Sequence, residues 1–105
     1  MIVITATVEL HARHWEDAKA LAQRHCEASR REPGCISHDW YPHPTREHTL
    51  FFYERWRDRA AIDAHFAEPY SAELVQCFQS WARSDVVLRM LTAGEVDERV
   101  IVRAG

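Results

Sequence analysis

EPGCISHDWYPHPTREHTLFFYERWRDRAAIDAHFAEPYSAEL, residues 32–74, is the stretch that decides the fold of this chain. Pro33-Gly34 favours the end of a helix, and two runs rich in aromatic residues then predict strands. Glu54 and Trp56 are two residues apart on the second of these strands, so both side chains point to one face. His65 follows within about two helical turns of the strand's end. We therefore expect a carboxylate, an indole and an imidazole to converge on a pocket.

Periodicity extends this pattern on both sides of the stretch. Alternation over residues 2–10 predicts a strand, and apolar spacings of three and four over residues 12–31 predict an amphipathic helix. Asp58 is a suitable N-cap for a short helix that Pro69 interrupts. The expected elements are strands at 2–10, 35–41, 48–56 and 86–92, helices at 12–31, 59–67 and 71–83, and a short fifth strand at 96–102.

The order of these elements indicates the fold class. Strand, helix, strand, strand, broken helix and strand form the split βαβ pattern of the ferredoxin-like fold. A chain of 105 residues is the size of one domain, so we expect a single α+β unit over residues 1–105. Its helices should cover one face of a four-stranded antiparallel sheet.

The strand at 48–56 is apolar on both faces. Phe52 and Trp56 lie on the face that carries Glu54, whereas Phe51 and Tyr53 lie on the other. Helices can cover only one side of the sheet, and large exposed apolar patches usually mark interfaces. The sequence therefore predicts a homodimer in which two sheets pack face to face.

Composition excludes several partner classes. The net charge is −3 and no basic patch is present, so nucleic acid is not expected as a partner. No apolar run approaches the roughly 20 residues of a membrane span, and the N-terminal run alternates like a strand, which predicts no signal peptide. Three cysteines without CxxC spacing predict reduced thiols in a cytoplasmic protein.

Metal and nucleotide cofactors are also not expected. Of seven histidines, His11 and His14 have a chelating spacing, but no third ligand lies near them and HExxH is absent. The three glycines are far apart, so no glycine-rich phosphate loop exists. The sequence therefore predicts neither a cofactor nor a metal site.

Three motifs resemble one family. EPGC at 32–35, YERW at 53–56 and AAIDAH at 60–65 resemble the antibiotic biosynthesis monooxygenases, which are small dimeric α+β barrel proteins. The element order matches over nearly the whole chain. That family includes cofactor-free oxygenases of quinols and polycyclic phenols, haem-degrading enzymes, signal-molecule isomerases and members of unknown role.

The resemblance carries over to particular residues. Glu54, Trp56 and His65 occupy positions that match the family pattern, whereas Tyr70 follows Pro69 where many members have a second histidine. This departure argues against a two-histidine mechanism.

The haem-degrading branch is a poorer match. Its pattern needs an asparagine on the first strand and an axial histidine on the later helix. The first strand offers only Thr5 and Thr7, and residues 71–83 contain no histidine.

The resemblance implies a cofactor-free monooxygenase with a quinol-like or polycyclic phenolic substrate and O2. Such a substrate donates an electron to O2 once it is deprotonated, and His65 is the natural base because an imidazole titrates near pH 6.5. We expect catalytic roles for His65, Tyr70 and Glu54. The residues expected to bind substrate are Trp56, Trp40, His38 and Arg89.

Each assignment has a structural alternative. His65 could only tie its helix to the sheet, and Glu54 could be a buried anchor. Trp56 and His38 could simply belong to the core. Two other functions also fit the pattern, namely a proton-transfer isomerase of a small carbonyl compound that uses the same His65, and a non-catalytic dimeric binding or stress-associated protein.

Overall fold

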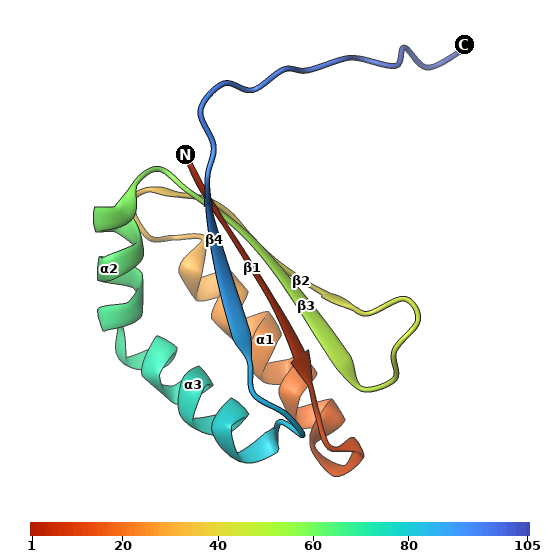
Figure 1. Cartoon of the computed structure of the whole chain (residues 1–105), viewed down its shortest axis with the longest axis vertical. Helices are drawn as coiled ribbons and strands as arrows, with labels where there is room; N and C mark the ends of the chain where they lie inside the picture. Colours follow the sequence, from red (N-terminus) through yellow and green to blue (C-terminus); the bar gives the residue numbers. More distant parts are fainter.

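A four-stranded antiparallel sheet forms the centre of the molecule (Figure 1). The computed structural model describes residues 1–105. The strands are β1 (Ile2–Glu9), β2 (Cys35–Pro42), β3 (Thr49–Trp56) and β4 (Val87–Thr92), in the order β2-β3-β1-β4. The central β1 pairs with both β3 and β4. This is the ferredoxin-like arrangement that the element order predicts.

The helices lie together against one face of the sheet (Figure 1). They are α1 (Trp15–Ser29), α2 (Arg59–Ala67) and α3 (Pro69–Trp81), and a single 3₁₀ turn at Ala12–His14 precedes α1. Asp58 caps α2, because its Oδ1 accepts the backbone N–H of Ala61 at 2.9 Å. No helix of the structure is both long and apolar enough to span a membrane.

Three predicted boundaries need correction. The helix expected at 12–31 is shorter at both ends. Pro69 begins α3 instead of preceding it, since the first position of a helix needs no N–H donor. The strand expected at 96–102 is absent. That segment runs away from the sheet without pairing (Figure 1), and Ile101 is 96% exposed. A β-prone sequence is stable as a strand only where its side chains pack against neighbouring strands, and the exposed side chains of this segment have no such neighbours.

The core lies between the sheet and the helices. Alternate residues of β1 are buried, which follows from the two-residue period of a strand. Two apolar clusters result, a larger one that includes Phe52 and Phe78 and a smaller one that includes Trp56 and Ile62. The ring of His38 lies between them, with its centroid 6.4 Å from that of Phe52 and 6.1 Å from that of Trp56.

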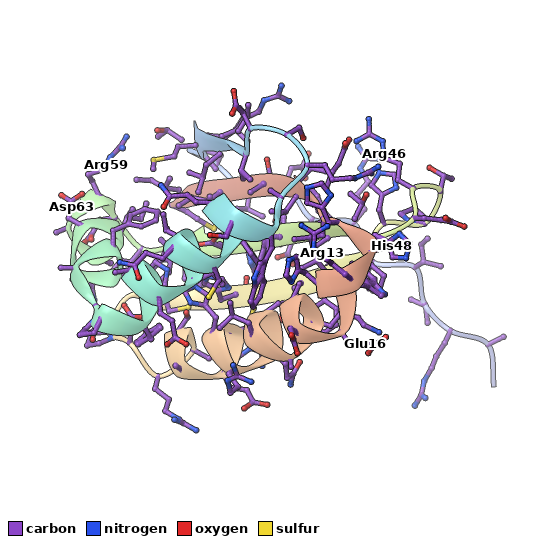
Figure 2. All side chains as sticks on the ribbon, turned by 90° about the horizontal axis from the view of Figure 1, so that it is seen from below. Arg13, Glu16, Arg46, His48, Arg59 and Asp63 are labelled. Atoms are coloured by element: carbon purple, nitrogen blue, oxygen red, sulfur yellow. The ribbon has the colours of Figure 1, made fainter.

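Charged side chains such as Arg59 and Asp63 of α2 point outward, away from the core (Figure 2).

The face of the sheet opposite the helices carries no helix. Phe51 and Tyr53 of β3 lie on that face and are only half-buried, while Val87 and Leu91 of β4 are exposed.

Candidate functional site

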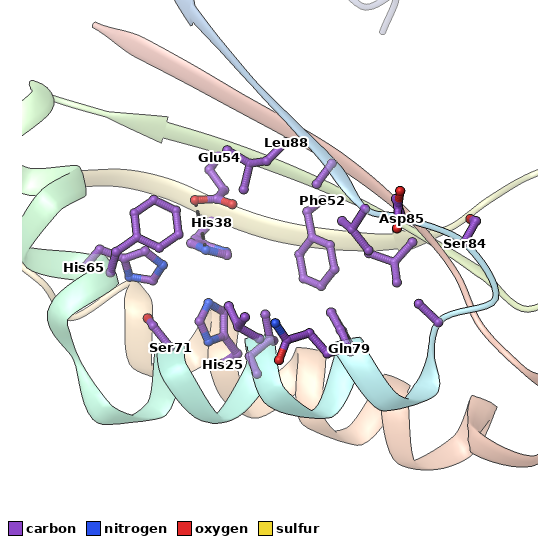
Figure 3. A pocket seen from close by; sticks show the side chains of 18 residues that line it. His25, His38, Phe52, Glu54, His65, Ser71, Gln79, Ser84, Asp85 and Leu88 are labelled. Atoms are coloured by element: carbon purple, nitrogen blue, oxygen red, sulfur yellow. Dashed lines mark ion pairs between the residues drawn. The ribbon is translucent and has the colours of Figure 1, made fainter.

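A cavity of about 400 Å³ opens between the sheet and the helices (Figure 3). Ten of its 18 lining residues are hydrophobic, and they come from β1, β3, α2, α3, β4 and the segment that leads into β4. Polar side chains gather at one end, where Figure 3 shows three imidazoles close together. The residues of this polar end are His25, His38, Glu54, His65 and Ser71.

Strand register brings two of these residues together. His38 of β2 pairs directly with Glu54 of β3, and both side chains point toward the helices. The Nε1–H of Trp56 donates to Glu54 Oε1 at 2.9 Å. His38 Nε2 lies 3.2 Å from the same oxygen, which is ion-pair distance, although its N–H is poorly aligned for a hydrogen bond.

Glu54 is held as a carboxylate despite its burial. Burial alone opposes ionisation, but the contact with His38 and the hydrogen bond from Trp56 outweigh it. The pKa of Glu54 is therefore below its ordinary value. A negative charge thus sits behind His38 at the polar end of the cavity.

Cys26, His38 and Glu54 form a line that resembles a nucleophile–base–acid arrangement. Cys26 Sγ lies 3.2 Å from His38 Nδ1. However, Cys26 is fully buried and does not line the cavity. Burial raises the pKa of the Cys26 thiol to about 12, so it stays protonated and inaccessible. The structure therefore argues against cysteine catalysis, and Cys26 acts here as a neutral partner of His38.

A second carboxylate–histidine pair involves His65 of α2. Its Nδ1 lies 2.8 Å from Glu32 Oε2, and the hydroxyl of Tyr70 donates to the same oxygen. Glu32 reaches this place because the chain turns sharply at Gly34, whose φ is +85°. With Nδ1 bound to the carboxylate, the basic nitrogen of a neutral His65 ring is Nε2.

His25 of α1 completes the polar end. Its ring centroid is 5.0 Å from that of His38 and 5.1 Å from that of His65, and its Nδ1 has no hydrogen-bond partner. Burial first, and then the two neighbouring histidines, lower the pKa of His25 to about 3. His25 is therefore neutral at physiological pH. Of all the side chains at this end, these three imidazoles form the group that has the donors to hold a metal ion.

The structure separates the residues that the sequence singled out. His38, Glu54 and His65 line the cavity. Trp56 is fully buried behind them, with its ring centroid 4.7 Å from that of His65. Tyr70 contacts Glu32 and does not line the cavity.

Two residues expected to bind substrate lie elsewhere. Trp40 packs along α1, where its Nε1–H donates to Gln23 Oε1 at 2.9 Å, and it does not line the cavity. Arg89 points to the opposite face of the sheet, because it pairs with Thr5 and its neighbour Leu88 takes the cavity side. The expectation that these two residues and Trp56 line the substrate pocket does not hold for this cavity.

Three residues of the site escaped the sequence analysis, namely His25, Glu32 and Ser71. His25 falls on the same helical stripe as Ala18, Ala22 and Cys26, so its burial was readable from the spacing. Glu32 precedes Pro33-Gly34, but its contact with His65 spans 33 residues and has no local signal.

Comparison with known proteins agrees with this structure. A family profile described as antibiotic biosynthesis monooxygenase matches residues 1–77. An uncharacterized protein of Synechocystis sp. (strain ATCC 27184 / PCC 6803 / Kazusa), sll1783, is 41% identical over 75 residues, which are 71% of this chain and 51% of the relative. The chain thus spans about half the length of that curated relative.

Solved structures share the fold. A crystal structure of an antibiotic biosynthesis monooxygenase matches with a TM-score of 0.83 and 25% identity, covering 90% of this chain and 100% of the other. The structure of Rv0793 from Mycobacterium tuberculosis matches with a TM-score of 0.84 and 22% identity, covering 92% of this chain and 98% of the other. A protein from Deinococcus radiodurans matches with a TM-score of 0.89 and 20% identity, covering 95% of this chain and 99% of the other. The last two similarities show the fold alone. Because the family profile matches residues 1–77, which is more than half of the sequence, this chain belongs to the antibiotic biosynthesis monooxygenase family.

Proposed function

We propose that the chain is a cofactor-independent oxygenase of a quinol-like or polycyclic phenolic small molecule. His65 would take a proton from the bound substrate, and the resulting anion would react directly with O2. The observation that supports this most is the pair formed by His65 Nδ1 and Glu32 Oε2, 2.8 Å apart, on a ring that lines a largely apolar cavity.

The pair has the features of a general base. Glu32 fixes one tautomer of the ring and stabilises the imidazolium that forms when Nε2 accepts a proton. Tyr70 bonds to the same carboxylate oxygen and positions it. A base placed in this way typically contributes about 10²- to 10⁴-fold to the rate.

The apolar walls suit an aromatic substrate. Phe52 and Phe78 belong to the lining, and the cavity volume of about 400 Å³ is within the range of small-molecule sites. Ser71 is buried at the polar end, and its hydroxyl has no partner. That hydroxyl would donate to the phenolate oxygen once His65 has taken its proton.

The oxidation balances without flavin or metal when the substrate supplies all the electrons. A methylene group beside the keto tautomer of the phenol loses a proton to His65, which leaves the phenolate, and this anion passes one electron to O2. The two radicals then join through a C–O bond to give a peroxide anion, which takes the proton back from His65. Loss of water from that hydroperoxide leaves a carbonyl group. In the net reaction one methylene group and one O2 molecule give one carbonyl group and one water molecule.

Oxygen consumption with a panel of hydroquinones and polycyclic phenols tests this function. We expect turnover by protein treated with EDTA, a loss of at least tenfold in kcat for His65→Gln, and no change for His43→Gln in the β2–β3 loop. No uptake above spontaneous autoxidation with any compound would overturn the proposal. If deuterium from the solvent entered a small carbonyl compound instead, the isomerase alternative would replace it.

The assembly that we propose is a homodimer. Phe51 and Tyr53 lie on the sheet face that no helix covers, and a second copy packed there would bury both. Two sheets packed face to face would form the α+β barrel that the family resemblance implies.

A further inference from the structure

We infer that His25, His38 and His65 form a binding site for a divalent transition-metal ion. The three imidazoles come from three separate elements, namely α1, β2 and α2. Each ring offers one nitrogen, and these nitrogens all lie within 4.8 Å of one another. Figure 3 shows the rings gathered around one end of the cavity. This inference does not rest on the proposed reaction.

Burial makes the cluster unlike a chance group of surface histidines. The exposed fractions are 5% for His25, 1% for His38 and 2% for His65. His25 Nδ1 has no hydrogen-bond partner although it is shielded from solvent, and His38 Nε2 has only the poorly aligned carboxylate of Glu54 at 3.2 Å. A buried polar atom without a partner is destabilising, because it has lost its hydrogen bonds to water. A bound metal ion would satisfy a ring nitrogen of each histidine.

The groups behind the rings match those of metal sites. A metal-binding histidine usually presents its second nitrogen to a carboxylate or another acceptor. His65 Nδ1 does this with Glu32 at 2.8 Å, which leaves Nε2 for the metal. Glu54 lies beside His38 at 3.2 Å, so a carboxylate stands next to each of these two rings and could balance the charge of a divalent cation.

The coordination number and the donor type narrow the choice of metal. Imidazole nitrogen favours Zn²⁺, Co²⁺, Ni²⁺, Cu²⁺ and Fe²⁺ over Mg²⁺ and Ca²⁺. Metal–nitrogen bonds of about 2.0–2.1 Å place the nitrogens of a tetrahedral site about 3.3 Å apart, so the rings must turn inward on binding. The cavity on the open side leaves the remaining position to water or a small ligand.

Titration of the metal-free full chain with Co²⁺ alone tests the site. We expect one Co²⁺ per chain, with the visible absorption bands of a low-coordinate ion and a rise in Tm. The variants His25→Gln and His38→Gln should bind at least tenfold more weakly, whereas the double variant His11→Gln/His14→Gln should bind like the wild type. Absence of binding, or binding that only the His11/His14 variant loses, would overturn the inference.

X-ray absorption of the zinc-loaded wild-type protein keeps the test decisive if a histidine variant fails to fold. We expect scattering from three imidazole ligands. A coordination shell made mainly of oxygen ligands, with one imidazole or none, would overturn the inference, because zinc bound at the protein surface has such a shell.

Discussion

At the residue scale, the site is an arrangement of buried histidines beside two carboxylates. His38 faces Glu54 and His65 faces Glu32, so each of these rings has an anionic neighbour. His25 has no such partner within hydrogen-bond distance. The three imidazoles therefore have different electrostatic surroundings although they lie close together. Burial and the adjacent rings keep His25 neutral, because a charge there would be desolvated and repelled.

The lowered pKa of His25 predicts a loss of stability in mild acid. In the unfolded chain His25 takes up a proton near pH 6.5, whereas in the folded protein it stays neutral until the pH falls to about 3. The unfolded state thus binds more protons in between, and stability falls as pH falls through this window. His38, His65 and Glu54 face His25 and act on its pKa.

Urea denaturation of metal-free protein between about pH 6.5 and pH 5 measures this effect. We expect the unfolding free energy to fall with decreasing pH by up to about 1.4 kcal/mol per pH unit from His25. His25→Gln should flatten the slope. An equal slope in both proteins would show that His25 is protonated in the folded state.

At the element scale, the turn between α1 and β2 positions Glu32 beneath α2. Gly34 has a positive φ, and a Cβ added there would lie 2.6 Å from Ala61 Cβ. Only glycine fits this turn without moving α2, which carries His65. The carboxylate–histidine pair therefore depends on a backbone conformation outside the cavity.

Gly34→Ala should destabilise the protein by about 1–3 kcal/mol and weaken turnover as well, because strain at φ +85° adds to the clash. Chemical denaturation measures the stability change. Gly94→Ala is the matched control, since an added Cβ there meets nothing within 4 Å. Equal stability of the two variants would contradict the role given to this turn.

The sequence predicted helices and strands well where the hydrophobic periodicity agreed with the positions of capping residues and prolines. Asp58 and Pro69 bracket α2, so the predicted range 59–67 matches Arg59–Ala67. It was harder to predict which face of β4 points toward the helices, because Val87 and Leu91 on one side are as apolar as Leu88 and Met90 on the other. Alternation gives no sign of the inner face in such a strand, so the sequence did not settle to which side Arg89 points.

The candidate site was predictable only in part for a related reason. The two-residue period of β3 puts Glu54 and Trp56 on one face. Contacts between distant elements, such as His65 with Glu32 or His25 with His38, depend on how the helices pack against the sheet. Local patterns do not fix that packing.

At the scale of the whole molecule, one face of the sheet holds the site and the other remains uncovered. If two copies pair through the uncovered face, Phe51→Lys should convert the dimer to a monomer, because it would bury an unpaired charge. Light scattering after size-exclusion chromatography measures the mass. Ala20→Lys, on the exposed side of α1, is the control and should remain dimeric. A monomeric wild type would contradict the proposed assembly.

The metal site and the base share His65, so the two uses exclude each other. We expect Zn²⁺ to lower oxygen consumption and EDTA to restore it, since a bound ion occupies the nitrogen that accepts the proton. Rates measured with and without EDTA check this expectation. Unchanged turnover in zinc-loaded protein would show that the two uses do not share this nitrogen.

Proton transfer to His65 is the central claim, and it is separable from the reaction with oxygen. Anaerobic mixing of a coloured polycyclic phenol with metal-free protein, followed by absorption spectroscopy, tests it most directly. We expect the phenolate spectrum to form with the wild type and to be lost with His65→Gln and weakened with Glu32→Gln. A neutral phenol spectrum with the wild type, or an equal phenolate signal from all three proteins, would contradict the account.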